Sequence, residues 1–168
     1  MACLAKSQIA LMARYHGWAT GRLVSSVAAL PEECYRRTCG LFFGSIHGTL
    51  NHLLLTDSEI WYPRFAESRS PSLPLGAELE PDRQLLASRL IDAAGKWSVY
   101  IEGLSEAALA DDLRYRMTTG QARELPMSAA LLHVFNHATH HRGQVTAAIS
   151  MMGFDYQSLD LPALIAQP

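Results

Sequence analysis

Four long segments with helical periodicity constrain this sequence more than any other feature. Apolar residues recur at intervals of three and four over residues 4–30, 45–66, 82–104 and 128–152, which is the spacing of one face of an α-helix. Pro31 follows the first segment and Gly153 the last, and both are typical of helix ends. Four such helices predict an all-α fold: a four-helix bundle, connected up-down-up-down or with a crossover.

The connections between these segments predict less structure. The stretch ESRSPSLPLGAELEP, residues 67–81, is rich in Ser, Pro and Gly and predicts a loop. Before the last segment, the alternation of Leu113, Tyr115 and Met117 and the following TTGQ predict a short β-hairpin. The partly apolar tail after Gly153 is expected to pack back onto the bundle. At 168 residues the chain is predicted to be a single domain, 1–168.

Composition argues against several classes of protein. The formal net charge is −2 and no basic stripe is present, so we expect no nucleic-acid partner. No apolar run reaches the roughly 18 residues of a membrane span, and the N-terminus lacks the pattern of a signal peptide. Three cysteines without CxxC spacing, Cys3, Cys34 and Cys39, fit a reducing compartment. The expectation is a cytoplasmic protein that does not bind membranes.

One stretch of the fourth segment, HVFNHATHH at residues 133–141, holds four of the seven histidines. With about 100° of rotation per residue, His137 and His141 lie about 40° apart, inside the apolar stripe that must face the core. His133 and His140 fall at the margin of that stripe. Burying two neutral imidazoles requires partners. Either they bind one divalent metal ion, or they form hydrogen bonds to carboxylates or carbonyls of neighbouring helices.

A metal site needs a third ligand from another helix, and three histidines remain as candidates. His47 and His52 both lie in the second segment but point in different directions, so periodicity alone does not choose between them. His52 has a polar strip that includes Glu59 on its side of the helix. His47 is expected to cap the helix start or face solvent. His16 is expected at an edge or on the surface.

Two motifs together make the chain resemble the DinB family, which is unrelated to the DNA polymerase of the same name. These motifs are GSIHGTLNHLLLTDSEIW in the second segment and HVFNHATHHRGQ in the fourth, with supporting similarity over nearly the whole chain. The resemblance implies a four-helix bundle, a divalent metal held by three histidines, and a homodimer. By motif position it implies His52, His137 and His141 as metal ligands. Relatives typically carry Asn in the first helix, where this chain has His16 and Thr20.

Three functions stay open at this point. A three-histidine site leaves a coordination position free, as in catalytic metal sites, and imidazole ligands suit zinc and nickel comparably. By resemblance, a metal-dependent enzyme would be a thiol S-transferase acting with a low-molecular-weight thiol, or a hydrolase. The alternatives are a metal-binding stress-response protein without turnover and a purely structural bundle. The catalytic acid or base is unknown. The candidates to act near the site are Glu59, Tyr115, Arg116 and Arg142. We interpret His133 and His140 as orienting or interface groups.

Overall fold

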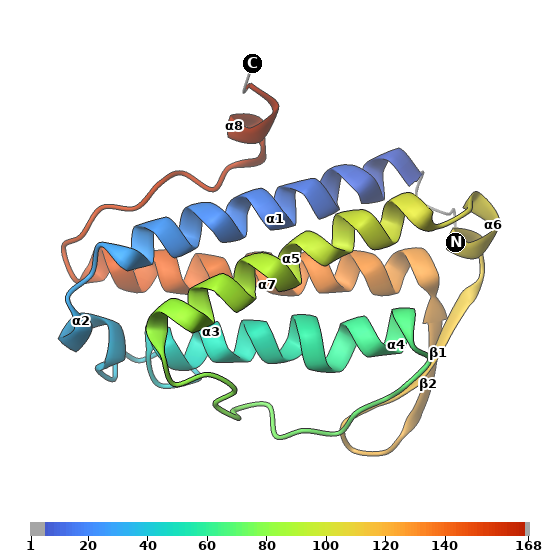
Figure 1. Cartoon of the computed structure of the whole chain (residues 1–168), viewed down its shortest axis with the longest axis horizontal. Coiled ribbons are helices and arrows are strands. Elements are labelled where there is room, and N and C mark those ends of the chain that lie inside the picture. Colours follow the sequence, from blue (N-terminus) through green and yellow to red (C-terminus); the bar gives the residue numbers. More distant parts are fainter. Residues whose placement is uncertain (1–5, 167–168) are drawn as a thin grey trace.

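The structure, a computed structural model, describes residues 6–166 (Figure 1). The start of the first predicted helix at residue 4, and Cys3, lie outside this range. The helices and strands in chain order are α1 (Lys6–Ala28), α2 (Glu32–Arg36), α3 (Ile46–Leu54), the π-helix η1 (Leu55–Trp61), α4 (Tyr62–Ala66), α5 (Arg83–Gly103), α6 (Glu106–Ala110), β1 (Asp112–Arg116), β2 (Ala122–Pro126), α7 (Met127–Met151) and α8 (Leu161–Ile165).

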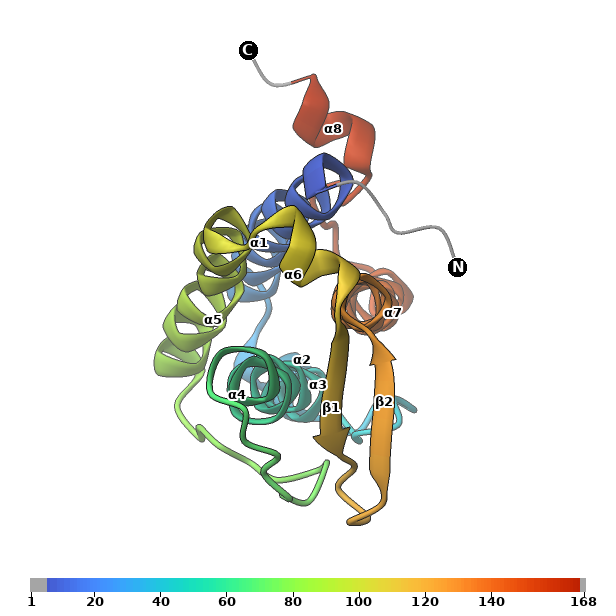
Figure 2. The ribbon, with the colours of Figure 1, turned by 90° about the vertical axis from the view of Figure 1, so that its right-hand side faces the viewer.

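The predicted four-helix bundle is confirmed, and its connections include a crossover. Its columns are α1, α5, α7 and the continuous column α3–η1–α4, seen end-on in Figure 2. In Figure 1 the α3–η1–α4 column and α5 both run from left to right, whereas α1 and α7 run from right to left. The predicted loop after α4 therefore runs back along the length of the bundle before α5 begins. This loop, residues 67–81, is called the crossover loop, and its backbone passes beside α3.

The helices begin and end at local signals. Ser45 caps α3 by accepting a hydrogen bond from the backbone N–H of Gly48, and Asp82 caps α5 by accepting from two backbone N–H groups. Gly153 follows α7 with a φ of 81°, a backbone conformation that glycine adopts without strain. Buried residues of α1 and α7 follow the expected spacing, among them Ile9, Ala13, Leu23, Val134, Ala138 and Val145.

The second predicted helix is not one regular α-helix. Its central residues, Leu55–Trp61, form a π-helix between α3 and α4. A π-helix holds more residues per turn than an α-helix and is often found at functional sites. Within it Asp57 is only 4% exposed, and its carboxylate accepts a hydrogen bond from His16 of α1. Periodicity could not predict this change, because both helix types keep a similar apolar pattern over so short a stretch.

The predicted β-hairpin is confirmed. Strands β1 and β2 are antiparallel, with Leu113 opposite Leu125 and Tyr115 opposite Arg123. The backbone N–H of Met127 donates to the carbonyl of Asp111, which fixes the base of the hairpin at the start of α7. The short helix α6 before it was not predicted. The hairpin closes one end of the bundle beside α4 (Figures 1 and 2).

The tail packs against α1, as predicted. The hydroxyl of Tyr15 donates to the carbonyl of Leu159 at 2.8 Å, and Nε of Arg22 donates to the carbonyl of Ser158. The core between the columns is apolar, with Trp97 and Phe135 fully buried. Within residues 6–166, no helix combines the length and apolar character needed to cross a membrane.

Candidate metal centre

Three histidines from two helices meet inside the bundle. His52 lies in the last turn of α3, and His137 and His141 lie one turn apart on α7. Nε2 of His137 is 3.3 Å from Nε2 of His52 and 3.1 Å from Nε2 of His141. One ligand nitrogen from each residue lies within 4.8 Å of the others, close enough to hold one metal ion together. The fold thus brings together all three histidines expected as ligands.

The outer nitrogens of two of these rings are held by oxygen acceptors. Nδ1 of His52 lies 2.8 Å from the backbone carbonyl of Leu75, on the crossover loop. Nδ1 of His141 lies 2.8 Å from Oε1 of Gln144. Because a carbonyl oxygen can only accept, both Nδ1 atoms carry the proton, and both Nε2 atoms present a lone pair. Such outer hydrogen bonds orient metal-binding imidazoles and raise their basicity.

This arrangement fits a divalent metal better than it fits hydrogen bonds alone. Nε2 of His137 can donate at most one proton, so it can satisfy only one of the two lone pairs that face it. The other remains buried without a donor, which costs free energy. A tetrahedral zinc site with bonds of about 2.05 Å separates its ligand nitrogens by about 3.3 Å. The two separations of 3.3 and 3.1 Å agree with that value.

Burial keeps the three imidazoles neutral, which is the form that binds metals. Burial is the largest cause that lowers the pKa of His52 to about 4 and that of His137 to about 3. The pKa of His141 is also lowered, mainly by burial, although the bond to Gln144 opposes the shift. At neutral pH none of the three rings needs to lose a proton before it can coordinate a cation.

Phe43, in the loop between α2 and α3, covers one side of the cluster. The ring of Phe43 stacks on His52, with 3.8 Å between centroids and 18° between planes, and lies 5.7 Å from the ring of His141. The loop approaches α3 so closely that a Cβ on Gly48 would lie 2.1 Å from the carbonyl oxygen of Phe43. Glycine is therefore required at position 48, and Phe43 shields this side of the histidines from water.

A cavity of about 310 Å³ opens beside the cluster, and His52 and His137 form part of its wall. This volume is at the small end of the range for small-molecule sites. Most of the remaining lining is apolar or aromatic and comes from η1, the crossover loop and the hairpin: Ile60, Trp61, Leu75, Tyr115, Met117 and Leu125. Arg64 is the single acidic or basic residue other than histidine among the described lining residues.

Of the residues expected to act near the cluster, only some lie beside the cavity. Tyr115 lines the cavity, as expected, but Glu59 and Arg116 do not. Glu59 accepts a hydrogen bond from Ser58, and the Arg116 side chain donates to the carbonyl of Gly120. No carboxylate is found among the described residues that line the cavity.

The two flanking histidines also differ. His133 lines the cavity, with its ring 5.8 Å from that of His137. His140 does not line the cavity, and its ring lies 4.9 Å from that of His141; both flanking histidines are exposed.

The expectation that His16 lies at an edge or on the surface is wrong. His16 is 1% exposed, and Arg142 of α7 is equally buried. Nη1 of Arg142 donates to Nδ1 of His16 at 2.9 Å, so the other ring nitrogen, Nε2, donates to Asp57 at 2.7 Å. These residues, the His16–Asp57–Arg142 network, contain one carboxylate and one guanidinium. A charged group on another helix compensates each buried charge, which periodicity along one helix cannot reveal.

The expectation that His47 faces solvent is also wrong. His47 is 6% exposed and accepts a hydrogen bond at Nδ1 from the hydroxyl of Tyr35. Its Nε2 donates to Glu78 of the crossover loop at 2.6 Å. Asn51 accepts the backbone N–H groups of Leu79 and Glu80. These bonds fix the crossover loop against α3, and thereby hold the Leu75 carbonyl on His52.

Sequence reasoning missed Arg64, Phe43 and the carbonyl of Leu75. Arg64 had a weak signal, because a lone cation stands among apolar and aromatic residues in IWYPRFA. The other two lie in connections whose path depends on the packed fold. No pattern of residues could have predicted them.

Comparisons with known proteins identify the family and agree with the fold. The model of the DinB family matches residues 4–167. Protein DinB of Bacillus subtilis (strain 168) is 24% identical over 146 residues, which cover 83% of this chain and 83% of that protein. Among solved structures, YfiT from Bacillus subtilis has a TM-score of 0.68 at 14% identity, over 92% of this chain and 93% of its own. YfiT is described as a probable metal-dependent hydrolase with an unusual four-helix bundle topology.

Proposed function

This chain belongs to the DinB family, and from that premise we propose that it is a metal-dependent hydrolase whose ion is held by His52, His137 and His141. The observation that carries the proposal is the convergence of three neutral imidazoles through Nε2 beside a cavity. The description of YfiT as a probable metal-dependent hydrolase supports the same activity class. Zinc and nickel are the ions we propose, because imidazole ligands suit both.

Three protein ligands leave a coordination position for water or substrate. When bound there, a divalent ion supplies a Lewis acid that polarises a carbonyl and lowers the pKa of water. Phe43 shields one side of the histidines, so the cavity is the side from which a small substrate reaches them. Apolar residues in its wall bind the body of the substrate and exclude bulk water. Leu75 and Gln144 keep two of the rings in the orientation that presents Nε2.

Hydrolysis also requires a proton to move. The oxygen of water forms a bond to the acyl carbon, the bond from that carbon to the leaving group breaks, and the water proton ends on the leaving group. Since no carboxylate is among the described lining residues, the imidazole of His133 is the group placed to carry that proton. His133 borders the cavity next to His137 and Trp61, with ring centroids 5.8 and 5.0 Å away.

One observation favours a second candidate function, transfer of a low-molecular-weight thiol. A thiol has an ordinary pKa of about 8.5, so coordination to a cation is sufficient to deprotonate it. Such a reaction needs no carboxylate base, and the described lining of the cavity holds none. In that case the thiol sulfur would form a bond to an electrophilic carbon as the bond to the leaving group breaks, and the thiol proton would end on the leaving group.

The first test is metal content. Protein purified without a histidine tag is measured by mass spectrometry, together with His52→Ala, His137→Ala and His141→Ala. His140→Ala is the matched control, because it removes an exposed neighbouring histidine. We expect near one equivalent of metal in wild type and control, and a loss in each of the three variants. Absence of metal even after reconstitution with zinc or nickel would contradict the proposal.

Activity assays on the metal-loaded protein then distinguish hydrolysis from thiol transfer. Small esters and amides test hydrolysis, and a low-molecular-weight thiol with an alkylating electrophile tests transfer. Turnover that needs no added thiol supports the hydrolase, and turnover only with thiol supports the transferase. Metal binding without either activity would leave a metal-binding protein, and the enzymatic proposal would be withdrawn.

A further inference from the structure

Arg64 is a buried cation in the wall of the cavity. It lies on α4 and is only 5% exposed. Its guanidinium lies between two aromatic rings, 4.5 Å from the ring centroid of Trp61 and 4.6 Å from that of Tyr115. Nη2 donates to the backbone carbonyl of Arg116 at 3.0 Å. These contacts fix the guanidinium in place between η1 and the hairpin.

The charge of Arg64 is not balanced within the described part of the chain. A guanidinium has five N–H donors, yet Arg64 forms a single hydrogen bond to the residues that the structure describes. Its Nε is buried without a partner, and no ion pair with a described carboxylate includes it. Burial lowers the pKa of Arg64, but arginine stays charged in proteins. A buried, unpaired charge is costly, and a bound anion would offset that cost.

The same cavity joins Arg64 to the histidine cluster. Its wall includes His52 and His137 as well as Arg64, and the surfaces between them are apolar. A ligand that fills this space presents an anionic group to Arg64, an apolar body to Trp61 and Ile60, and its other end to the histidines. Arginine suits this role because its planar fork binds carboxylate and phosphate oxygens in pairs.

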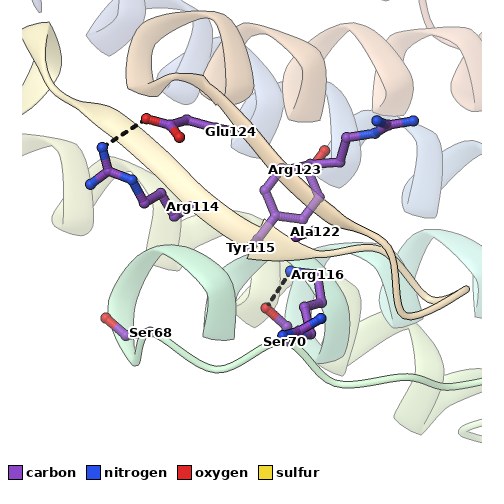
Figure 3. Close-up of a pocket in the computed structure, with 8 residues that line it drawn as sticks. All are labelled: Ser68, Ser70, Arg114, Tyr115, Arg116, Ala122, Arg123 and Glu124. Atoms are coloured by element: carbon purple, nitrogen blue, oxygen red, sulfur yellow. Dashed lines mark hydrogen bonds and ion pairs between the residues drawn. The ribbon is translucent and has the colours of Figure 1, made fainter.

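The hairpin also carries a basic surface depression that shares Tyr115 with this cavity. A surface depression of about 640 Å³ is lined by Tyr115 together with Arg114, Arg116 and Arg123 (Figure 3). Glu124 is the one carboxylate in its described lining, and it pairs with Arg114. Positive charge around the approach to a site raises the local concentration of anions. This depression therefore favours the same charge type as Arg64.

We propose that Arg64 binds an anionic group of the substrate, a carboxylate or a phosphate, and so directs the reactive bond toward the histidine cluster. The substrate class is a small anionic compound with an apolar body. This inference rests on the proposed function for the reaction, but the binding of the anion by Arg64 does not require a metal. The two proposals can therefore fail separately.

The test uses metal-free protein, dialysed free of chelator, and three small probes: benzoate, phenyl phosphate and the neutral benzamide. Affinities are measured by titration, and the Nε–H cross-peak of Arg64 is followed by NMR. We expect benzoate or phenyl phosphate to bind about ten- to a hundredfold more tightly than benzamide, because a charged hydrogen bond is lost with the amide. The preferred anion distinguishes a carboxylate substrate from a phosphate ester. The Arg64 cross-peak is expected to shift with that anion only.

Variants identify the residue responsible. Arg64→Gln is expected to abolish the preference for the anion, and Arg64→Lys to keep the preference at lower affinity. Arg14→Gln, which removes an exposed charge from α1, is the matched control and is expected to bind as wild type does. Equal affinity for benzoate, phenyl phosphate and benzamide in wild type, or undiminished anion binding in Arg64→Gln, would overturn the inference. If Arg64→Gln fails to fold, the wild-type affinities and the Arg64 cross-peak decide the question alone.

Failure of the proposed function has a different signature. Anion binding at Arg64 without metal binding or turnover would leave the inference intact and remove the hydrolase. Turnover of neutral and anionic esters at equal rates by the zinc-loaded protein would support the hydrolase and remove the inference.

Discussion

The bundle contains two buried polar clusters that differ in how their charges are balanced; both include residues of α7 and of the α3–η1–α4 column, and one also includes a residue of α1. The His16–Asp57–Arg142 network contains a carboxylate and a guanidinium, joined through an imidazole by hydrogen bonds of 2.7 and 2.9 Å. The cluster of His52, His137 and His141 contains only neutral rings, with lone pairs that face one another. In the network the two charges offset each other, although Nε of Arg142 has no hydrogen-bond partner among the described residues. In the histidine cluster the converging lone pairs exceed the donors available to them. This convergence of lone pairs, rather than burial alone, marks the histidine cluster as a ligand site.

The largest expected effect comes from breaking the complete network. Asp57→Ala leaves Arg142, 1% exposed, without its buried counter-charge. We expect the free energy of unfolding of the metal-free protein to fall by about 3–5 kcal/mol. Urea denaturation followed by circular dichroism measures this, with Asp92→Ala on the exposed side of α5 as the control. A loss below about 1 kcal/mol would mean that the network is not stabilised by its internal charges.

Adding metal should stabilise through the histidine cluster. Zinc at a hundred times its dissociation constant is expected to raise the free energy of unfolding by about 2.7 kcal/mol. The same addition should leave His137→Ala unchanged, because that variant lacks one of the three converging nitrogens. Thermal and urea unfolding with and without zinc measure the difference. Equal stabilisation of wild type and variant would place the ion elsewhere.

A smaller effect is expected from the group that orients one ring. Gln144→Ala removes the oxygen that holds Nδ1 of His141 at 2.8 Å. We expect metal affinity to fall about ten- to a hundredfold, with the fold intact. Competition with a coloured chelator measures the affinity, and Gln157→Ala in the exposed tail is the control. Unchanged affinity would show that the helix alone orients His141.

The smallest effect per step is expected from acid, because it accumulates gradually with each unit of pH. The folded-state pKa of His52 is about 4 and that of His137 about 3, whereas unfolded histidine titrates near 6.5. Between these values the unfolded chain binds more protons than the folded chain, so stability falls as the pH is lowered from about 7 toward 4. The slope is at most about 1.4 kcal/mol per pH unit for each histidine.

This dependence can be assigned to residues by urea denaturation of metal-free protein at a series of pH values. His137→Gln should give a clearly shallower slope, whereas His140→Gln, at an exposed position, should change the slope less. A slope that is no shallower in His137→Gln than in His140→Gln would mean that other groups cause the loss of stability in acid.

The sequence could predict those features of the fold and site whose residues are neighbours in the chain. The periodicity of α7 placed His137 and His141 on one buried face, because both positions follow from rotation along one helix. The third member of the cluster, His52, needed the family resemblance, since periodicity did not separate it from His47. The hairpin was predicted from alternation within a few residues. Each of these features depends on neighbours in the chain.

Features that depend on contacts between distant segments were missed or mistaken. His16 meets Asp57 across 41 positions, and Arg142 meets His16 across 126. The crossover loop reaches His52 only because Asn51 and His47 bind its backbone and Glu78. The homodimer stays a prediction that the single chain does not test. Burial and partners of polar residues follow from the packed fold rather than from any one segment.

The π-helix has a consequence for how the chain tolerates insertion and deletion. His52 precedes Leu55–Trp61 and Arg64 follows it, so this stretch sets the angle between them around the column. Because a π-helix turn holds about one residue more than an α-helix turn, deleting one residue there would restore an ordinary α-helix and leave Arg64 on nearly the same side of the column. Deleting a residue from a regular α-helix has no such compensation and turns everything after it by about 100°. The π-helix is therefore the part of this column where the chain can lose one residue and still keep His52 and Arg64 at the same cavity.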